Sequence, residues 1–407
     1  MLAFSAATLL APHAALKHAR MLVEHGRIVA VGPQSAAPIP AGVSLTDFGD
    51  HIVAAGYLDL HIHGSAGYDV MDSSPDALPA IECSLARHGV TSYLPTTVTA
   101  SMDATLQTLD RLAGAIEEHE AARPEPLDNS RVTHGSPSSQ EVGSLAERAQ
   151  PLGIHLEGPF ISHVRRGVHP PENLLPPRVE TFERFWQAAR GRIRMMTIAP
   201  ELEGALELIA CAVARGVCIS VGHSDADFTA TERAVSAGAR HATHTFNAMR
   251  PLGHRDPGIL GAVLTDDRVT ADLIADGIHL DPAIVKLVAR AKGPERTVLI
   301  TDAISATGMP DGRYRLGSME VDVKDGRCET AGRLAGSVLT MDRAVRNLSS
   351  FAECDLASAI AAASRNPARV LGGNNKGALE VGADADFVVL NEEGNVLRTF
   401  IAGIERA

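Results

Sequence analysis

Aromatic side chains and long apolar runs are both scarce in this chain. Only 4% of its 407 residues are aromatic, so the core must be mainly aliphatic and a surface that stacks nucleic-acid bases is not indicated. No run is long and apolar enough to span a bilayer. The apolar stretch at residues 1–11 imitates a secretory signal, but it lacks a basic start and continues into strand-like sequence. We therefore expect no membrane partner.

Clusters of positive charge and paired cysteines are also missing. The formal net charge is −12 and long runs of Lys and Arg do not occur, which argues against nucleic acid or an anionic membrane as the main partner. The cysteine count is five, an odd number, and no CxxC pair occurs. These features predict a reduced, cytoplasmic protein rather than a disulfide scaffold.

The two ends of the chain each carry a hairpin signal. Residues 19–33 contain two β-rich runs around a turn at His25-Gly26. Residues 383–403 repeat the pattern around Glu393-Gly394. Because neither end alone has enough apolar surface to fold, we predict that the two hairpins pair into one small β-sandwich.

The central part of the chain alternates short apolar runs with helix-like stretches. Such alternation favours right-handed βαβ units and a parallel sheet, and eight units favour an α/β fold closed into a (β/α)₈ TIM-like barrel. An open, doubly wound sheet is the alternative. The eight predicted strands are residues 53–63, 91–99, 153–159, 193–200, 217–223, 241–248, 270–279 and 297–302.

These patterns divide the chain into two domains and leave two stretches outside the simple repeat. The small β-sandwich is predicted from residues 1–51 with 377–407, and the barrel from residues 52–376. Residues 119–150 are rich in Pro, Ser, Glu and Gly, which is typical of a flexible surface insertion. Residues 313–333 alternate like a strand pair and predict a hairpin after the eighth strand.

Six of the eight predicted strands end in residues that can bind a metal or move a proton. A (β/α)₈ barrel builds its site at the carboxyl ends of its strands, and imidazole with carboxylate suits a first-row divalent ion. Any one of these histidines alone would fit a core or surface role, but histidines clustered in register with a barrel favour a metal site. These strand-end residues are Asp59, His61, His63, His155, Glu157, His223, His244, Asp276, His279 and Asp302.

The strand-end positions suggest different roles for three of these residues. His155 shares a face with Glu157 but lies one step deeper, so a place in the core or behind the ligands is favoured over a ligand role. Asp302 suits a proton-transferring base, with a further ligand or a helix N-cap as the alternatives. The histidines outside the strand ends are expected at the surface: His13, His18, His25, His51, His88, His119 and His134.

A set of motifs occurs in the order found in one known family. HIHG, LEGPF, GHS, THTFNAM, ADGIHLD, TDA and LAGSVLTM together resemble the N-acetylglucosamine-6-phosphate deacetylases of the amidohydrolase superfamily. The resemblance spans nearly the whole chain, and LEGPFIS…GVHPPE followed by THTFNAM is specific to this group. It implies hydrolysis of the N-acetyl amide of N-acetylglucosamine 6-phosphate to glucosamine 6-phosphate and acetate.

The resemblance also implies a metal centre. Glu157, His223 and His244 resemble the ligands of the family's main metal, and His61 and His63 resemble ligands of a second position. Some relatives have Gln and Asn in place of this pair and work with one metal, so one or two ions per subunit are expected. Zinc is favoured, with iron, manganese or cobalt as alternatives.

Catalytic and substrate contacts follow from the same resemblance. Asp302 resembles the family's proton-transferring aspartate, which takes a proton from the attacking water and then gives one to the amine. His169, in RRGVHPPE, resembles the histidine that contacts the acetyl carbonyl and stabilises the oxyanion. Sugar, phosphate and lining contacts are implied at Asn247, Ala248, Arg255, His279, Leu334, Ala335 and Gly336, although relatives often have Ser at the position of Ala335.

The family resemblance further implies a homodimer in which Arg255 reaches the phosphate in the neighbouring subunit's site. Its loop, PLGHRDPG, is rich in Pro and Gly and suited to project beyond the barrel. The alternative is that Arg255 serves its own site or only a surface loop. Two other functions stay open: the same chemistry on a related substrate such as N-acetylgalactosamine 6-phosphate, and a barrel that binds without catalysis. Intact ligands and base favour the enzyme.

Overall fold

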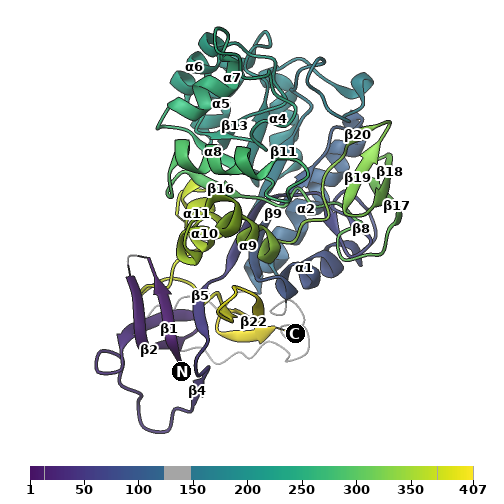
Figure 1. The fold of residues 1–407 in the computed structure, drawn as a ribbon. Coiled ribbons are helices and arrows are strands. Elements are labelled where there is room, and N and C mark those ends of the chain that lie inside the picture. The colour runs from purple at the N-terminus through teal and green to yellow at the C-terminus, as the bar shows by residue number, and fades with distance from the viewer. Residues whose placement is uncertain (13, 123–147, 374, 407) are drawn as a thin grey trace.

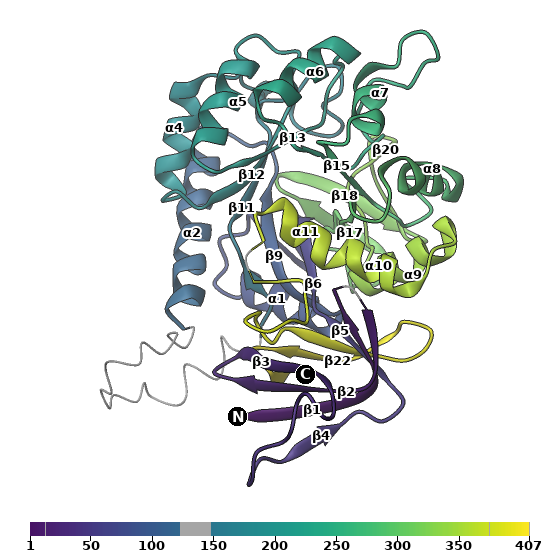
Figure 2. The same cartoon turned by 90° about the vertical axis from the view of Figure 1, so that its left-hand side faces the viewer.

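The computed structural model describes residues 1–12, 14–122, 148–373 and 375–406. It contains a parallel barrel, a sheet built from both termini, and a small antiparallel sheet at one side of the barrel (Figures 1 and 2). The predicted insertion at residues 119–150 lies largely outside the described residues. Among the described helices, none combines the length and the apolar character needed to cross a bilayer.

The barrel has eight parallel strands that pair in chain order. They are β6 (Tyr57–Ile62), β9 (Val90–Thr97), β11 (Ile154–Glu157), β12 (Ile193–Ile198), β13 (Cys218–Val221), β14 (His241–Ala242), β15 (Thr270–Leu273) and β16 (Thr297–Leu299). Each overlaps one predicted strand. The first and last strands meet at a parallel bridge between Ile62 and Ala303. Because the order never reverses and the ends meet, the predicted barrel is confirmed and the open doubly wound sheet is wrong.

Helices cover the outside of the barrel (Figure 2), because parallel strands need crossover connections. Ser101, Asp227, Asp281 and Asp355 each cap a helix by accepting a hydrogen bond from a backbone N–H of its first turn. The helices are α1 (Ala77–Arg87), α2 (Met102–Ala121), α4 (Val179–Ala188), α5 (Ala205–Ala214), α6 (Phe228–Ala237), α7 (Gly258–Thr265), α8 (Pro282–Lys292), α9 (Met341–Ala352), α10 (Leu356–Ala363), α11 (Arg365–Val370) and the short 3₁₀ helix η1 (Pro171–Asn173).

Strands from both chain termini form a single eight-stranded sheet. They are β1 (Leu2–Ala11), β2 (Ala14–Glu24), β3 (Arg27–Pro33), β4 (Leu45–Asp47), β5 (Ile52–Ala55), β21 (Phe387–Leu390), β22 (Val396–Ile401) and β23 (Ile404–Arg406). The turn between β2 and β3 is at His25 and Gly26, whose φ values of 50° and 75° suit a tight hairpin. The sheet surrounds its own apolar core, in which the rings of Phe4 and Phe387 lie 5.0 Å apart. The predicted pairing of the two ends is therefore confirmed.

The predicted first strand, residues 53–63, is divided between two sheets. β5 pairs with β21 in the terminal sheet, whereas β6 pairs with β9 in the barrel. Gly56 separates them, and a Cβ atom there would lie 2.3 Å from Cγ2 of Thr91, so only glycine fits this crossing. Residues 52–55, which the sequence pattern assigned to the barrel, thus belong to the terminal sheet, and we place the domain boundary at Gly56.

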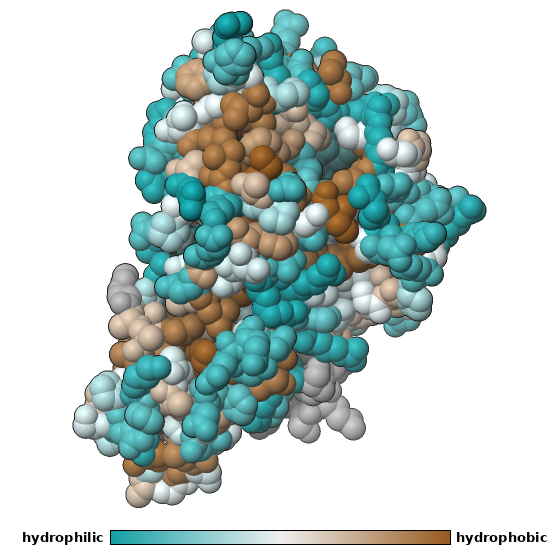
Figure 3. Space-filling model, in the orientation of Figure 1, coloured by the Kyte–Doolittle hydropathy of each residue, from teal (hydrophilic) through white to brown (hydrophobic). Residues whose placement is uncertain are grey.

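The predicted hairpin at residues 313–333 is part of a four-stranded antiparallel sheet. Its strands are β17 (Gly312–Leu316), β18 (Met319–Lys324), β19 (Arg327–Thr330) and β20 (Arg333–Leu334). One face of the sheet buries Val321 against Ile304, which follows β16, while the outer surface in Figure 3 is mostly hydrophilic. Short strands β7 (Gly64–Ser65), β8 (Tyr68–Asp69) and β10 (Gln150–Pro151) complete the described structure.

Candidate metal centre

The carboxyl ends of the barrel strands bring the five predicted ligands together. His61 lies on β6 and His63 directly follows it, and alternation along the strand puts both on one face. Glu157 is the last residue of β11, and His223 and His244 follow β13 and β14. All five side chains are buried.

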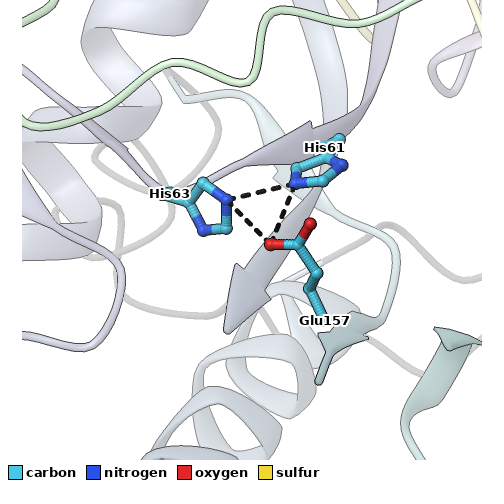
Figure 4. A group of neighbouring side chains, drawn as sticks. All are labelled: His61, His63 and Glu157. Atoms are coloured by element: carbon cyan, nitrogen blue, oxygen red, sulfur yellow. Dashed lines mark hydrogen bonds and ion pairs between the residues drawn. The ribbon is translucent and has the colours of Figure 1, made fainter. Parts of the chain in front are cut away.

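Glu157 lies between two pairs of histidines. Its Oε1 atom is 3.1 Å from Nε2 of both His223 and His244, and these two nitrogens are 3.0 Å apart. Its Oε2 atom is 3.2 Å from Nε2 of His63 and 3.4 Å from Nε2 of His61 (Figure 4). The last two nitrogens are 3.1 Å apart. Two groups of three ligand atoms therefore share one carboxylate.

This arrangement fits one or two divalent ions. Ligand atoms around a tetrahedral ion with bonds of about 2.0–2.1 Å lie roughly 3.3 Å from one another, and both groups are close to that spacing. Imidazole nitrogen and carboxylate oxygen are donors that zinc and its first-row neighbours accept. Because each Glu157 oxygen faces a different histidine pair, this residue could supply a ligand to each position.

Hydrogen bonds on the far side of the rings orient two of the histidines. Nδ1 of His63 donates to the carbonyl oxygen of Thr96 (3.1 Å), and Nδ1 of His223 donates to that of Arg165 (2.9 Å). A carbonyl oxygen can only accept, so Nδ1 carries a proton in both rings, and Nε2 is the nitrogen that can offer a lone pair to an ion once it carries no proton of its own. Nδ1 of His61 and of His244 is buried without a hydrogen-bond partner in the described residues.

The centre attracts positive charge. Burial opposes the charged form of His244, but the hydrogen bond and negative charge of Glu157 raise the pKa of that histidine to about 9. Burial also opposes the charge of Asp302, yet the hydrogen bond from His63 and the charge of His61 lower its pKa to about 2. Protons or a divalent ion can supply this positive charge, so ion binding must release protons.

Asp302 lies at the rim of the two ligand groups, after β16. Its Oδ1 atom is 3.3 Å from Nε2 of His63 and 3.6 Å from Nε2 of His61. The backbone of Asp302 has a φ of 50°, and His223 and His244 have φ values of 47° and 30°. Such left-handed backbone is uncommon outside glycine and gathers at functional sites. These sharp turns follow the strand ends and direct the side chains toward the centre.

A cavity of about 180 Å³ opens over the ligands. Its wall includes Asp302, His169 and six of the predicted substrate contacts, namely Asn247, Ala248, His279, Leu334, Ala335 and Gly336. It also includes Gly167 and Val168, which precede His169 in the RRGVHPPE motif but were given no role, and Val98 and Leu316, which lie outside the motifs.

Arg255 is the predicted substrate contact that is not in this wall. It is exposed, and within the described residues it has neither a hydrogen bond nor an ion pair. The structure of one subunit therefore does not bring it to the site.

His169 reaches the cavity from the loop between β11 and α4. Its Nε2 atom is 3.6 Å from Oε2 of Glu157, and its Nδ1 atom contacts Thr99. Burial, aided by the charge of His223, lowers the pKa of His169 to about 3. The ring is therefore neutral, and it can make a hydrogen bond to a substrate without carrying charge.

Asp276 supports another histidine of the cavity wall. Its Oδ2 atom is 2.7 Å from Nδ1 of His279, and its Oδ1 atom accepts hydrogen bonds from the backbone N–H groups of Ile278 and His279. Burial raises the pKa of Asp276, but the contact with His279 outweighs this effect and lowers it. Asp276 therefore orients His279 and belongs to neither ligand group.

Other histidines occupy different environments. His155 lies behind the ligands, as predicted, because its Nδ1 donates to the carbonyl oxygen of Leu60 (3.0 Å) and its Nε2 is 2.8 Å from Oγ1 of Thr197. The predicted surface position of His119 is wrong. This residue is buried, and its Nε2 lies 3.2 Å from Oε2 of Glu82, a partner from a distant part of the chain. His13 and His134 lie outside the described residues.

Comparison with known proteins shows the family to which this chain belongs. The model of the amidohydrolase family matches residues 52–405, which is most of the chain. The chain belongs to the amidohydrolase family. The match includes the barrel with every metal-ligand candidate and the C-terminal part of the terminal sheet, so the family resemblance seen in the motifs is confirmed.

Several amidohydrolases resemble the chain over nearly its whole length. An N-acetylglucosamine-6-phosphate deacetylase from Lysinibacillus sphaericus is 38% identical over 364 residues, 89% of this chain and 87% of that protein. An N-acetylgalactosamine-6-phosphate deacetylase from Escherichia coli O157:H7 is 38% identical over 397 residues, 95% of this chain and 98% of that protein. A solved structure of an N-acetyl-D-glucosamine-6-phosphate deacetylase variant from Mycobacterium smegmatis, in complex with N-acetyl-D-glucosamine-6-phosphate, is 35% identical with a TM-score of 0.86, covering 99% and 98% of the two chains.

Proposed function

We propose that this amidohydrolase hydrolyses the N-acetyl amide of N-acetylglucosamine 6-phosphate to glucosamine 6-phosphate and acetate. The observation that carries the proposal is the meeting of two histidine pairs at Glu157, with Asp302 and His169 in the wall of the same cavity. A divalent ion held there, zinc by preference and iron, manganese or cobalt as alternatives, supplies Lewis-acid chemistry that lets water attack an amide at neutral pH.

Asp302 and His169 divide the remaining chemistry. The low pKa of Asp302 keeps its side chain as a carboxylate, which can accept the proton of the attacking water. The same group then gives a proton to the departing amine. His169 is neutral and donates a hydrogen bond to the acetyl oxygen, on which negative charge develops as water attacks.

The cavity wall suits a phosphorylated amino sugar. Asn247 and His279 offer polar atoms, and Ala248 is small enough to let a ligand approach the backbone. The segment from Leu334 to Gly336 lines the same cavity. The Mycobacterium smegmatis relative binds N-acetyl-D-glucosamine-6-phosphate, and the chain covers nearly all of that fold.

A second subunit would supply the missing positive charge. The cavity wall of the described residues contains neither Lys nor Arg, although the proposed substrate carries a phosphate. Arg255 is exposed and unpaired among the described residues. We therefore place this enzyme in a homodimer in which Arg255 of each subunit makes a charge-assisted contact with the phosphate in the other site.

The cytoplasm is the proposed location of the enzyme. All five cysteines are free thiols in the structure, and their odd number with no CxxC pair suits a reducing compartment. We propose neither a nucleic-acid nor a membrane partner.

The second candidate substrate is N-acetylgalactosamine 6-phosphate, because the similar protein from Escherichia coli O157:H7 is an N-acetylgalactosamine-6-phosphate deacetylase. Acetate release should be measured with the ion-loaded enzyme on both sugar phosphates. We expect kcat/KM to be higher for N-acetylglucosamine 6-phosphate. A higher value for the galactosamine epimer would change the substrate but keep the chemistry. No acetate from either sugar would contradict amide hydrolysis of these substrates.

A further inference from the structure

The end of β9 contacts two histidines of the site although this strand supplies no metal ligand. Thr96, within β9, offers its carbonyl oxygen to Nδ1 of His63 (3.1 Å). Thr99, two residues after the strand, contacts Nδ1 of His169 with both its hydroxyl oxygen (2.8 Å) and its backbone N–H (3.3 Å). All four residues are buried. Bulk water therefore does not compete for these contacts.

The chemistry of the Thr99 contact determines where the ring of His169 carries its proton. A backbone N–H can only donate, so Nδ1 of His169 must accept. A neutral imidazole has one bare nitrogen and one N–H, and the proton is therefore on Nε2. The hydroxyl of Thr99 then also donates to Nδ1, at the shorter distance of 2.8 Å.

Gly158 leaves room for this contact. It follows Glu157 directly, and a Cβ atom at this position would lie 2.1 Å from Oγ1 of Thr99 and 3.6 Å from Nδ1 of His169. Its φ of 74° is also a conformation that glycine adopts without strain. The glycine of the LEGPF motif thus allows Thr99 to approach the ring.

We propose that Thr99 is a positioning residue that holds His169 in the tautomer with its proton on Nε2, the nitrogen that donates to the acetyl oxygen of the substrate. The inference rests on the proposed function and deepens it. Near the same strand end, the Thr96 carbonyl keeps a proton on Nδ1 of His63, so the neutral form of this ring has the opposite tautomer, with Nε2 available to an ion. Thus Thr96 in β9 orients one ring as a metal ligand, and Thr99 just beyond the strand orients another as a hydrogen-bond donor.

Removing the hydroxyl of Thr99 should weaken this control but leave the fold intact. In Thr99→Val, Nδ1 of His169 keeps only the longer bond from the backbone N–H, so the other tautomer becomes more populated. The loss of about one neutral hydrogen bond corresponds to roughly a fivefold fall in kcat. We expect KM to change less than kcat, because the contact with His169 strengthens as charge develops on the acetyl oxygen.

Thr97 provides a matched control on the same strand. Its hydroxyl is buried but has no hydrogen-bond partner among the described residues, so Thr97→Val removes the same group without touching His169. Thr99→Ser keeps a hydroxyl and should restore most of the activity. All variants should be compared at equal metal content and with matching circular dichroism.

The tautomer itself can be measured without substrate. In zinc-loaded protein labelled with ¹⁵N-histidine, two-bond nitrogen–proton correlations distinguish a bare ring nitrogen from a protonated one, and His169→Gln identifies the signals of His169. We expect a bare Nδ1 in the wild-type protein and in Thr97→Val, and a mixed signal in Thr99→Val.

These measurements separate the inference from the proposed function. A proton on Nδ1 of His169 in the wild-type protein would overturn the inference. So would a kcat of Thr99→Val no lower than that of Thr97→Val. The ring of His169 could have the expected tautomer in a wild-type protein that releases no acetate from either sugar phosphate. In that case the control of the tautomer by Thr99 stands, and the role of His169 in binding the acetyl oxygen fails together with the proposed function.

Discussion

The backbone N–H of Asp302 donates a hydrogen bond to the carbonyl oxygen of His61 over 2.9 Å. This bond joins the segment that follows the last barrel strand to the first strand, at the level of the metal ligands. The next residues continue the seam, since the N–H of His63 donates to the carbonyl of Ala303 (2.8 Å). Closure of the barrel therefore brings the proposed proton-transferring group beside one histidine pair, so errors in closure would damage the fold and the site together.

The sharing of Glu157 leads to a prediction about metal content. Glu157→Gln should lose ions from both positions, because the neutral amide is a poorer ligand for either histidine pair. His61→Asn should weaken only the position that it shares with His63. Metal analysis after dialysis against zinc gives ions per subunit for each variant. Equal losses in the two variants would contradict the shared carboxylate.

Removal of the metal should abolish activity. Water is a poor nucleophile toward an amide at neutral pH unless an ion activates it. Chelation should therefore stop acetate release, and added zinc or another divalent ion should restore it. Ion-free protein, checked by metal analysis, that retained full activity would rule out the proposed chemistry.

Asp302→Asn should separate proton transfer from metal binding. Asparagine keeps the shape of the side chain but cannot accept the proton, so kcat should fall by about 10²–10⁴-fold. Metal content should stay near that of the wild-type protein, because Asp302 lies outside both ligand groups. If the variant also loses its metal, Asp302 is mainly a ligand and the proposed role is wrong.

Lys292 should make stability depend on pH in the alkaline range. Its Nζ donates to the carbonyl oxygens of Val263 (2.7 Å) and Asp266 (2.8 Å), and burial, aided by the charge of Arg296, lowers its pKa to about 8. The unfolded chain has a value near 10.4. Between these values the unfolded state binds more protons, so stability rises with pH in this window.

The matching variant is Lys292→Met, which cannot titrate. From about pH 7.5 to about pH 10, the wild-type protein should gain about 2 kcal/mol relative to this variant, since one pKa unit corresponds to about 1.4 kcal/mol. Urea unfolding at the two pH values measures the difference. A difference that does not change with pH would show that the pKa of Lys292 is not lowered.

The sequence predicted the features that follow from strand geometry. The carboxyl ends of parallel strands in a barrel must converge, so Glu157, His223 and His244 could be placed together although long stretches of chain separate them. The alternation of β6 likewise put His61 and His63 on one face. These predictions depend on short-range patterns and on a topology that admits few alternatives.

The features that the sequence did not predict depend on distant contacts. Gly56 lies within a continuous apolar run, and nothing local shows that the chain leaves one sheet and enters another there. His119 has no local signal of burial, because its partner Glu82 is on another helix. Thr99 lies just after β9, a strand that supplies no metal ligand, so the local sequence gives no sign of a function. Its role follows only from its contact with His169, which comes from a distant loop.

A shared site can be tested by mixing two damaged subunits. Arg255→Ala should be nearly inactive if its guanidinium binds the phosphate in the neighbouring site, and Asp302→Asn should be nearly inactive because proton transfer fails. In a mixed dimer with shared sites, one site carries both lesions and the other carries none. Random exchange of equal amounts makes about half of the dimers mixed, so activity should recover to about a quarter of wild type.

The alternative gives a different result. If Arg255 serves its own subunit, every site in a mixed dimer keeps one lesion, and activity stays near the average of the two variants. Exchange must first be confirmed by the mass of the mixed dimer, because subunits that do not exchange would also show no recovery. Recovery of activity after confirmed exchange supports a site completed by the neighbouring subunit. No recovery after confirmed exchange would show that Arg255 does not bind the phosphate across the interface.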